Sequence, residues 1–212
     1  MTRLQNICNL IISTKLLVNR VSSNSEARER VLKAAEQLFV ERGYEAVTVK
    51  DIAKAVGIHH ASIYHHIPGG KSALYVEVMT RHMQRYREGI KAVIDRGQGD
   101  LRKQLQHIAA WIISQPPVNI IRLETSDLPS IGDTQADNIS NLAFEATLLP
   151  IMKVLEDARN RGEIEHQNLG YIAGAIFASM EAFHGISNKY VDGSRLLMAN
   201  KLIEVFIRGI KV

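Results

Sequence analysis

The residues with the most chemistry to offer gather between positions 59 and 71, where four of the chain's eight histidines stand. Imidazole is a common metal ligand. However, no acid or cysteine lies among these histidines, and on a short helix the two pairs would face different sides. We therefore predict no metal site. The alternative is contact with a nucleic acid, because hydroxyl, imidazole and ammonium groups donate hydrogen bonds to phosphates.

The residues predicted to contact double-stranded DNA combine such donors with short side chains that let a helix approach thymine methyl groups. They are Thr48, Lys50, His59, His60, Ala61, Ser62, Tyr64, His65 and Lys71. Lys71 follows two glycines at a helix start, where free backbone N–H groups favour an anion. A nucleotide-binding loop would need another glycine spacing and a preceding strand, so we discount it. His66 could instead pack as a structural histidine.

Two short helices would position these side chains. Thr48 is a candidate N-cap with Asp51 three residues on, and Gly57 is a favourable helix stop because glycine tolerates positive φ. A second helix is expected over residues 59–66. Two short helices joined by a glycine turn form the frame of a helix-turn-helix, whose second helix enters the major groove of DNA.

This pattern resembles the DNA-binding domain of TetR/AcrR-type repressors. The positions that carry the resemblance are Thr48, Asp51-Ile52-Ala53, Val56-Gly57-Ile58, Ser62 to Ile67, Lys71 and Leu74. The stretch from Arg30 to Tyr44 is similar to that family's first helix. The chain departs from the family at His59, where Ser or Thr is frequent, and at Ile67, where Phe is frequent. The resemblance implies a homodimeric repressor that binds a palindromic operator and is released by a small organic effector.

Bulk composition is compatible with such a protein. The chain is 46% hydrophobic with a net charge of +4, which suits nucleic-acid binding but also a mildly basic soluble protein. Cys8 is the single cysteine, so no internal disulfide is possible and a reducing compartment is indicated. No apolar run reaches transmembrane length. We expect a cytoplasmic protein with no membrane partner.

Helical periodicity continues to the end of the chain, without strand alternation. We predict an all-α fold of about nine helices: an N-terminal three-helix helix-turn-helix domain and a C-terminal helical ligand-binding and dimerisation domain. Residues 24–86 are assigned to DNA binding, including the start of a connecting helix, and residues 87–212 to effector binding and dimerisation. Pro150 should kink or split the helix over residues 135–161.

Residues 1–23 fit no part of the pattern. A signal peptide, a helix lying on a membrane surface and an over-long gene start are the alternatives for this stretch. We interpret it as a weakly ordered extension.

The last two predicted helices suggest a second copy of the chain. Small residues lie on one side of the first helix: Gly170, Ala173, Gly174 and Ala178. Apolar residues line the second: Leu196, Leu202, Ile203, Phe206 and Ile210. Packing within one chain would explain these patterns as well. The resemblance implies that these two helices from each subunit form a four-helix bundle.

The candidate effector-binding residues are apolar or aromatic with a few polar groups, as is usual for sites that hold small organic molecules. They are His107, Trp111, Phe144, Met152, Phe177, Met180 and His184. For each one singly, an ordinary place in the core is the alternative. No catalytic constellation appears, so we expect neither an enzyme nor a cofactor. Other hypotheses are a helical interaction protein whose DNA contacts have decayed and an enzyme in the C-terminal bundle.

Overall fold

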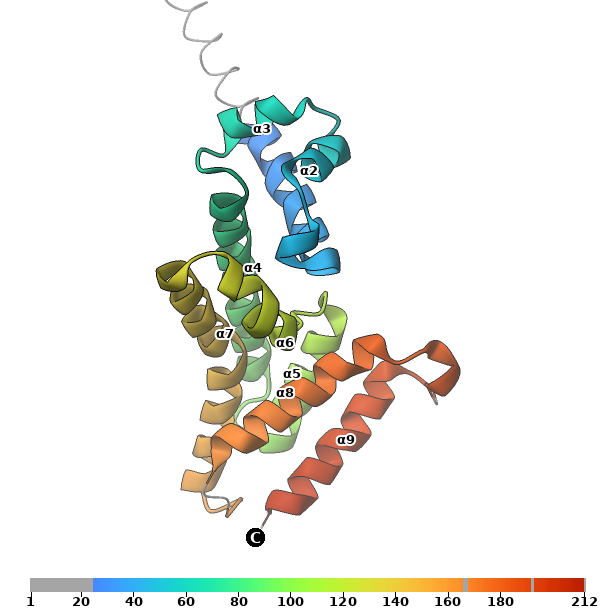
Figure 1. Cartoon of the computed structure of the whole chain (residues 1–212). Coiled ribbons are helices and arrows are strands. Elements are labelled where there is room, and N and C mark those ends of the chain that lie inside the picture. Colours follow the sequence, from blue (N-terminus) through green and yellow to red (C-terminus); the bar gives the residue numbers. More distant parts are fainter. Residues whose placement is uncertain (1–24, 166–167, 192, 212) are drawn as a thin grey trace, which may run out of the picture. The chain divides into compact units, whose positions relative to one another are not determined.

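The computed structural model describes residues 25–165, 168–191 and 193–211, which form two compact units (Figure 1). The first unit ends at Val78 and the second begins at Met79. The described residues consist of helices, turns and one isolated backbone bridge, so the all-α prediction is confirmed. The predictions for residues 1–23 concern positions outside the described residues. No helix in the described part of the chain is long and apolar enough to cross a membrane.

The first unit holds the helix over residues 25–46, α2 (Val49–Val56), α3 (His60–His66) and the beginning of α4 (Gly70–Arg96) (Figure 1). An aromatic cluster fills its centre. Phe39 meets Tyr75 edge to face with 5.0 Å between ring centroids, and Tyr44 meets Tyr75 at 4.9 Å. Ile52 of α2 and Ile63 of α3 are fully buried. The core thus anchors α2 and α3 through one buried face each.

Side-chain caps fix the two short helices. The Thr48 hydroxyl accepts from the Asp51 N–H at 3.2 Å, and the Asp51 carboxylate accepts from the Thr48 N–H at 2.9 Å. This capping box was predicted and is confirmed. Gly57 ends α2 with φ of 76°, also as predicted. At the start of α3, His59 Nδ1 accepts from the Ala61 N–H at 3.4 Å. His59 therefore serves as the N-cap of α3.

The second unit holds the remainder of α4, α5 (Leu101–Ser114), α6 (Ile120–Arg122), a π-helical segment (Leu123–Asp127), a 3-10 segment (Leu128–Ser130), α7 (Asp133–Asn160), α8 (Leu169–Gly185), a second 3-10 segment (Asn188–Tyr190) and α9 (Arg195–Ile210). In Figure 1, α8 and α9 lie side by side, and α5 packs against both. Leu105, Ile108 and Ile112 of α5 are fully buried. Ile203 and Ile210 of α9 are also buried, so they pack within the unit.

The long helix α7 runs through Pro150 without a break. Of the two predicted effects of this proline, a kink or a split, the split does not occur. Ala146, Ile151 and Val154, on either side of the proline, are all buried in the unit's core. Packing of this face holds the helix together although the proline lacks a backbone donor.

Candidate functional site

The outward side of α3 carries most of the residues predicted to contact DNA. Ile63 and Ile67 turn into the core of the first unit. His60, Ala61 and His65 are exposed on the other side. The helix therefore presents imidazoles and a small methyl-bearing residue to solvent, on a surface held rigid from behind by its isoleucines. Such a surface has the size and donors to enter a major groove.

Tyr64 and Lys71 both lie near the corner between α3 and α4. The Tyr64 side chain is 52% exposed, and its ring lies 3.5 Å from the point where a Cβ on Gly70 would stand. The Lys71 ammonium lies 4.0 Å from the centre of the Tyr44 ring and 3.5 Å from the Glu45 carbonyl oxygen. This cation–π contact holds the charge at the beginning of α4. A hydroxyl and an ammonium are thus brought to the same corner.

The residues at the start of α2 differ in what they can offer to a phosphate. Lys50 is exposed. The Thr48 hydroxyl is already engaged, since it accepts from the Asp51 N–H and donates to the Asp51 carboxylate at 2.6 Å. The Thr48 side-chain bond, followed by its backbone bond, lowers the pKa of Asp51 below its ordinary value. Thr48 therefore positions α2, and Lys50 is an exposed cation near its start.

Arg28, which was not among the predicted site residues, braces α3. Its Nε donates to the carbonyl oxygen of His66 at 3.3 Å, and its Nη2 pairs with the Glu77 carboxylate at 2.6 Å. One guanidinium thereby joins the first helix to the end of α3 and to α4. His66 is half-buried with no hydrogen-bond partner at Nδ1, in keeping with the structural role considered for it. No motif singles out an arginine with this role.

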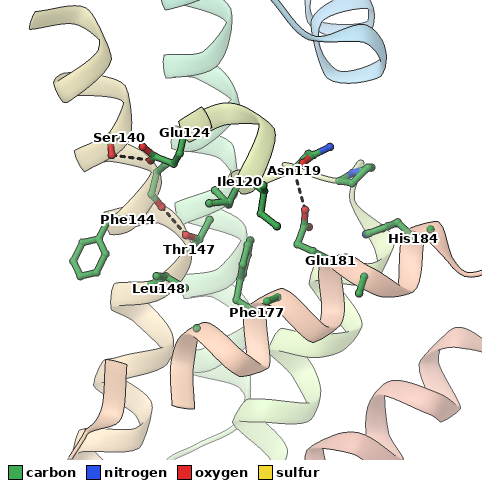
Figure 2. Close-up of a pocket in the computed structure, with 17 residues that line it drawn as sticks. Asn119, Ile120, Glu124, Ser140, Phe144, Thr147, Leu148, Phe177, Glu181 and His184 are labelled. Carbon is green, nitrogen blue, oxygen red and sulfur yellow. Dashed lines mark hydrogen bonds between the residues drawn. The ribbon is translucent and has the colours of Figure 1, made fainter. Parts of the chain in front are cut away.

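A pocket of about 800 Å³ opens in the second unit, where α6 and the π-helical segment meet α7 and α8 (Figure 2). Its walls are mainly apolar with several polar side chains. The lining residues are Pro117, Asn119, Ile120, Ile121, Glu124, Ser140, Ala143, Phe144, Thr147, Leu148, Gly174, Phe177, Ala178, Glu181, Ala182, His184 and Gly185. Volume and composition suit a small organic molecule.

Three of the seven predicted effector-binding residues line this pocket: Phe144, Phe177 and His184. The other four do not. They are His107, Trp111, Met152 and Met180. Met180 is fully buried on the side of α8 that faces the core.

Trp111 of α5 lies behind the pocket wall, with the Tyr86 ring between it and the wall residue Phe177. Its indole meets Tyr86 edge to face at 4.6 Å, and Tyr86 in turn lies 6.3 Å from Phe177, a wall residue. The indole rests on Gly89, where no side chain would fit. Trp111 is therefore linked to the pocket through Tyr86.

Glu181 is one of the two carboxylates that line the pocket, and it was not among the predicted residues. Its Oε2 accepts from the Asn119 N–H at 2.9 Å, as Figure 2 shows, while its Oε1 is shielded from solvent. Burial raises the pKa of the Glu181 carboxyl, opposed by the Asn119 bond and by His184. Burial, then the Glu181 charge and the hydrogen-bonding proximity of its carboxylate, raise the pKa of the Tyr86 hydroxyl.

A sequence signal for Glu181 existed. It is the only Asp, Glu, Lys or Arg in the otherwise apolar helix α8, and such a residue needs a reason to be there. Glu124 and Ser140, hydrogen-bonded at 2.7 Å near the pocket's other side, carry no comparable signal because both lie among polar neighbours. Within the described residues, no group of three or more His, Cys, Asp or Glu side chains is placed to hold a metal ion.

Comparison with known proteins gives consistent results. Residues 31–78 match the family model described as bacterial regulatory proteins, tetR family. The transcriptional regulator LmrA of Bacillus subtilis is 30% identical over 113 residues, which make up 49% of this chain and 60% of LmrA. The transcriptional repressor KstR2 of Rhodococcus jostii is 37% identical over 78 residues, which make up 35% of this chain and 38% of KstR2. The chain thus matches at most 60% of these relatives' length.

Solved structures extend the likeness to the second unit. AibR, crystallised with isovaleryl coenzyme A and operator DNA, aligns with a TM-score of 0.67 over 84% of this chain and 97% of AibR. The sequences are 18% identical, so the likeness is one of fold.

Proposed function

We propose that the chain is a repressor that binds operator DNA and is released by a small molecule, because residues 31–78 match the tetR family model and the fold likeness to AibR extends over the second unit. In this proposal the first unit carries DNA binding, and the second carries effector binding and dimerisation. This activity would be exercised in the cytoplasm, where a bacterium keeps its DNA. No catalytic role is proposed for either unit.

The observation that carries the proposal is the outward side of α3. It exposes imidazoles and the Tyr64 hydroxyl while Ile63 holds the helix from behind, and Lys71 adds a cation at the same corner. A helix buried on one side and rich in donors on the other is the arrangement that reads a major groove. Retention of these donors argues against a protein whose DNA contacts have decayed.

A homodimer through α8 and α9 is part of the proposal. Tyr171 of α8 is 76% exposed, and Val205 of α9 is 64% exposed. Leu196 and Leu197 near the start of α9 are also exposed. Large apolar side chains concentrated on two neighbouring helices favour burial against a partner, and a two-fold dimer matches a palindromic site. Analytical ultracentrifugation of the wild type and of Val205→Glu tests this part.

The effector proposal rests on the pocket at α8. To release DNA, a ligand must bind the state that does not bind DNA more tightly than the state that does, because otherwise no equilibrium shifts. The isovaleryl coenzyme A of AibR is not carried over to this chain, since likeness at 18% identity concerns the fold.

The deciding experiment is selection of fragmented genomic DNA by the full-length protein, followed by sequencing of the bound fragments. Recovery of one palindromic site supports the proposal. Binding without any sequence preference would mean that the protein binds DNA through its positive charge alone. A compound screen on the operator complex should then find ligands that release DNA and change the emission of Trp111, the chain's single tryptophan, through Tyr86 and Phe177. A ligand that changes emission and leaves DNA bound would remove the effector role.

A further inference from the structure

The charge of the pocket wall is one-sided. The wall carries two carboxylates, Glu124 and Glu181, and one imidazole, His184. None of the lining residues in the described chain is a lysine or arginine. An organic acid entering this pocket would meet two negative charges and no fixed positive one, in surroundings too apolar to screen the repulsion.

The two carboxylates are not equivalent. Glu124 is exposed, and its Oε1 accepts from the Ser140 hydroxyl at 2.7 Å. Glu181 is half-buried: its Oε2 accepts from the Asn119 N–H, and its Oε1 is shielded from solvent. A carboxylate charge held in apolar surroundings costs free energy, and a cation beside it offsets that cost. A neutral ligand cannot do so.

The surroundings of Glu181 define the rest of the ligand. Ile120 and Phe177 line the pocket as apolar walls, and Figure 2 shows their side chains near that of Glu181. The face of an aromatic ring such as Phe177 also attracts a cation. The pocket therefore places the Glu181 carboxylate beside a wide apolar space.

We propose, as a refinement of the proposed regulatory function, that the effector is a protonated organic amine with an apolar body. The ammonium group pairs with the Glu181 carboxylate, and the apolar part lies along Ile120 and Phe177. Charge complementarity selects amines over alcohols of the same shape and rejects carboxylates.

Three titratable neighbours face Glu181 and set the conditions for a test. They are His184 on α8, and His82 and Tyr86 on α4. A charged imidazole would compete with the ammonium for the carboxylate. Measurements at about pH 8 keep a free histidine neutral, since it titrates near 6.5, while an alkylamine stays protonated.

The experiment compares phenylbutylamine, phenylbutanol and phenylbutanoate by calorimetry on the full-length protein. These probes share one apolar body and differ in a single polar group. We expect the amine to bind at least about tenfold more tightly than the alcohol, and the carboxylate more weakly than either. Equal affinities for amine and alcohol, preference for the carboxylate, or no amine binding at millimolar concentration would each overturn the proposal.

Variants assign the effect to one carboxylate. Glu181→Gln keeps an acceptor for the Asn119 N–H and removes the charge, so amine affinity should fall about tenfold while alcohol affinity stays. Glu124→Gln is the matched control and should change amine affinity less than about twofold, since its carboxylate is exposed. Unchanged amine affinity in Glu181→Gln would contradict the assignment. Should that variant misfold, the ranking of the three probes on the wild type still decides.

The outcome separates this inference from the regulatory function on which it rests. Amine selectivity in a protein that recovers no operator would leave the ligand class standing and refute the repressor. Recovery of an operator by a protein without amine selectivity would do the reverse. Release of the operator by the amine, and not by the alcohol at equal concentration, is the result expected if both hold.

Discussion

The two candidate sites of this protein are built in opposite ways. The predicted DNA-contacting residues lie between positions 48 and 71, on two short helices and the beginning of a third. The pocket draws its wall from α6, the π-helical segment, α7 and α8, across positions 117 to 185. A site made by consecutive residues can be found from spacing alone. A site made by distant segments depends on packing that spacing does not reveal.

The two sites also differ in charge and in exposure. The first exposes imidazoles and Lys50 to solvent, where an anionic partner can approach. The second encloses Glu181 in apolar surroundings. The first site should therefore favour an anionic partner and the second a cationic one. Substitutions in one site should leave binding at the other intact. The following predictions test that independence.

Removing the aromatic core of the first unit should have the largest effect. Phe39 is 1% exposed and contacts the rings of both Tyr44 and Tyr75. Phe39→Ala should therefore lower the free energy of unfolding of this unit by about 3–5 kcal/mol. Calorimetric melting should show an early transition accompanied by loss of DNA binding, while amine binding in the second unit persists. Phe39→Leu is the milder control. A single transition, with both activities lost together, would show that the units are not independent.

Loss of DNA affinity without loss of folding should follow from changes at the α3–α4 corner. Tyr64→Ala should weaken operator binding about tenfold by removing an exposed donor, and Lys71→Ala should also lower the salt slope by about one. Tyr64→Phe separates the hydroxyl from the ring. Fluorescence anisotropy at several salt concentrations gives these values. An unfolded circular dichroism spectrum for Tyr64→Ala would mean that the ring supports the core.

The sequence predicted the first unit well because its determinants are local. The Thr48–Asp51 cap and the Gly57 stop each act over a few residues, and both appear where they were expected. Even here, His59 as a cap was not foreseen, because imidazole is an unusual N-cap. Arg28 was missed because its partners, His66 and Glu77, are 38 and 49 residues away.

The second unit was predicted as helices but not as a pocket. Periodicity identified the buried faces, and Phe177 and His184 do line the pocket. It could not tell a residue in the wall from one behind it, and therefore Trp111 and Met180 were grouped with them. Asn119, which bonds Glu181, adopts positive φ at the start of a three-residue helix, a conformation without a clear sequence signal.

A smaller effect should come from the capping box at the start of α2. Thr48→Ala removes the acceptor for the Asp51 N–H and should lower the stability of the first unit by about 1 kcal/mol. The melting temperature of that unit should fall by several degrees, with the second unit unchanged. Thr48→Ser retains the hydroxyl and is the control. Equal melting of Thr48→Ala and the wild type would mean that water replaces the cap without loss.

The capping box also predicts an acid dependence. Bonds from Thr48 lower the pKa of Asp51 in the folded protein, so its stabilising contribution is present above the ordinary value of 3.8. That contribution is lost as the pH falls through the lowered folded value. Unfolding titrations of the wild type and Asp51→Asn between pH about 2 and 5 should converge at the acid end. A constant difference between them across this range would contradict the linkage.

The smallest expected effect concerns the histidines of the first site, which should respond to pH in opposite senses. His60 and His65 are exposed on α3, where a neighbouring phosphate favours the protonated form. Protonation there adds positive charge to a surface that binds by counterion release. His59 opposes this trend. Its Nδ1 accepts the capping bond from Ala61, and a protonated imidazole cannot accept.

Operator affinity should therefore rise only a few-fold as the pH falls from about 8 to 6, with a steeper salt slope at the lower pH. The double variant His60→Gln, His65→Gln should lose this rise and show a fall instead, because the His59 cap still weakens. His59→Ser keeps a cap acceptor that does not titrate and should enlarge the rise. Operator titrations at several pH values and two salt concentrations measure all three proteins. Identical pH profiles would show that these imidazoles stay neutral at the DNA surface, and loss of wild-type binding on adding a zinc chelator would restore the metal interpretation.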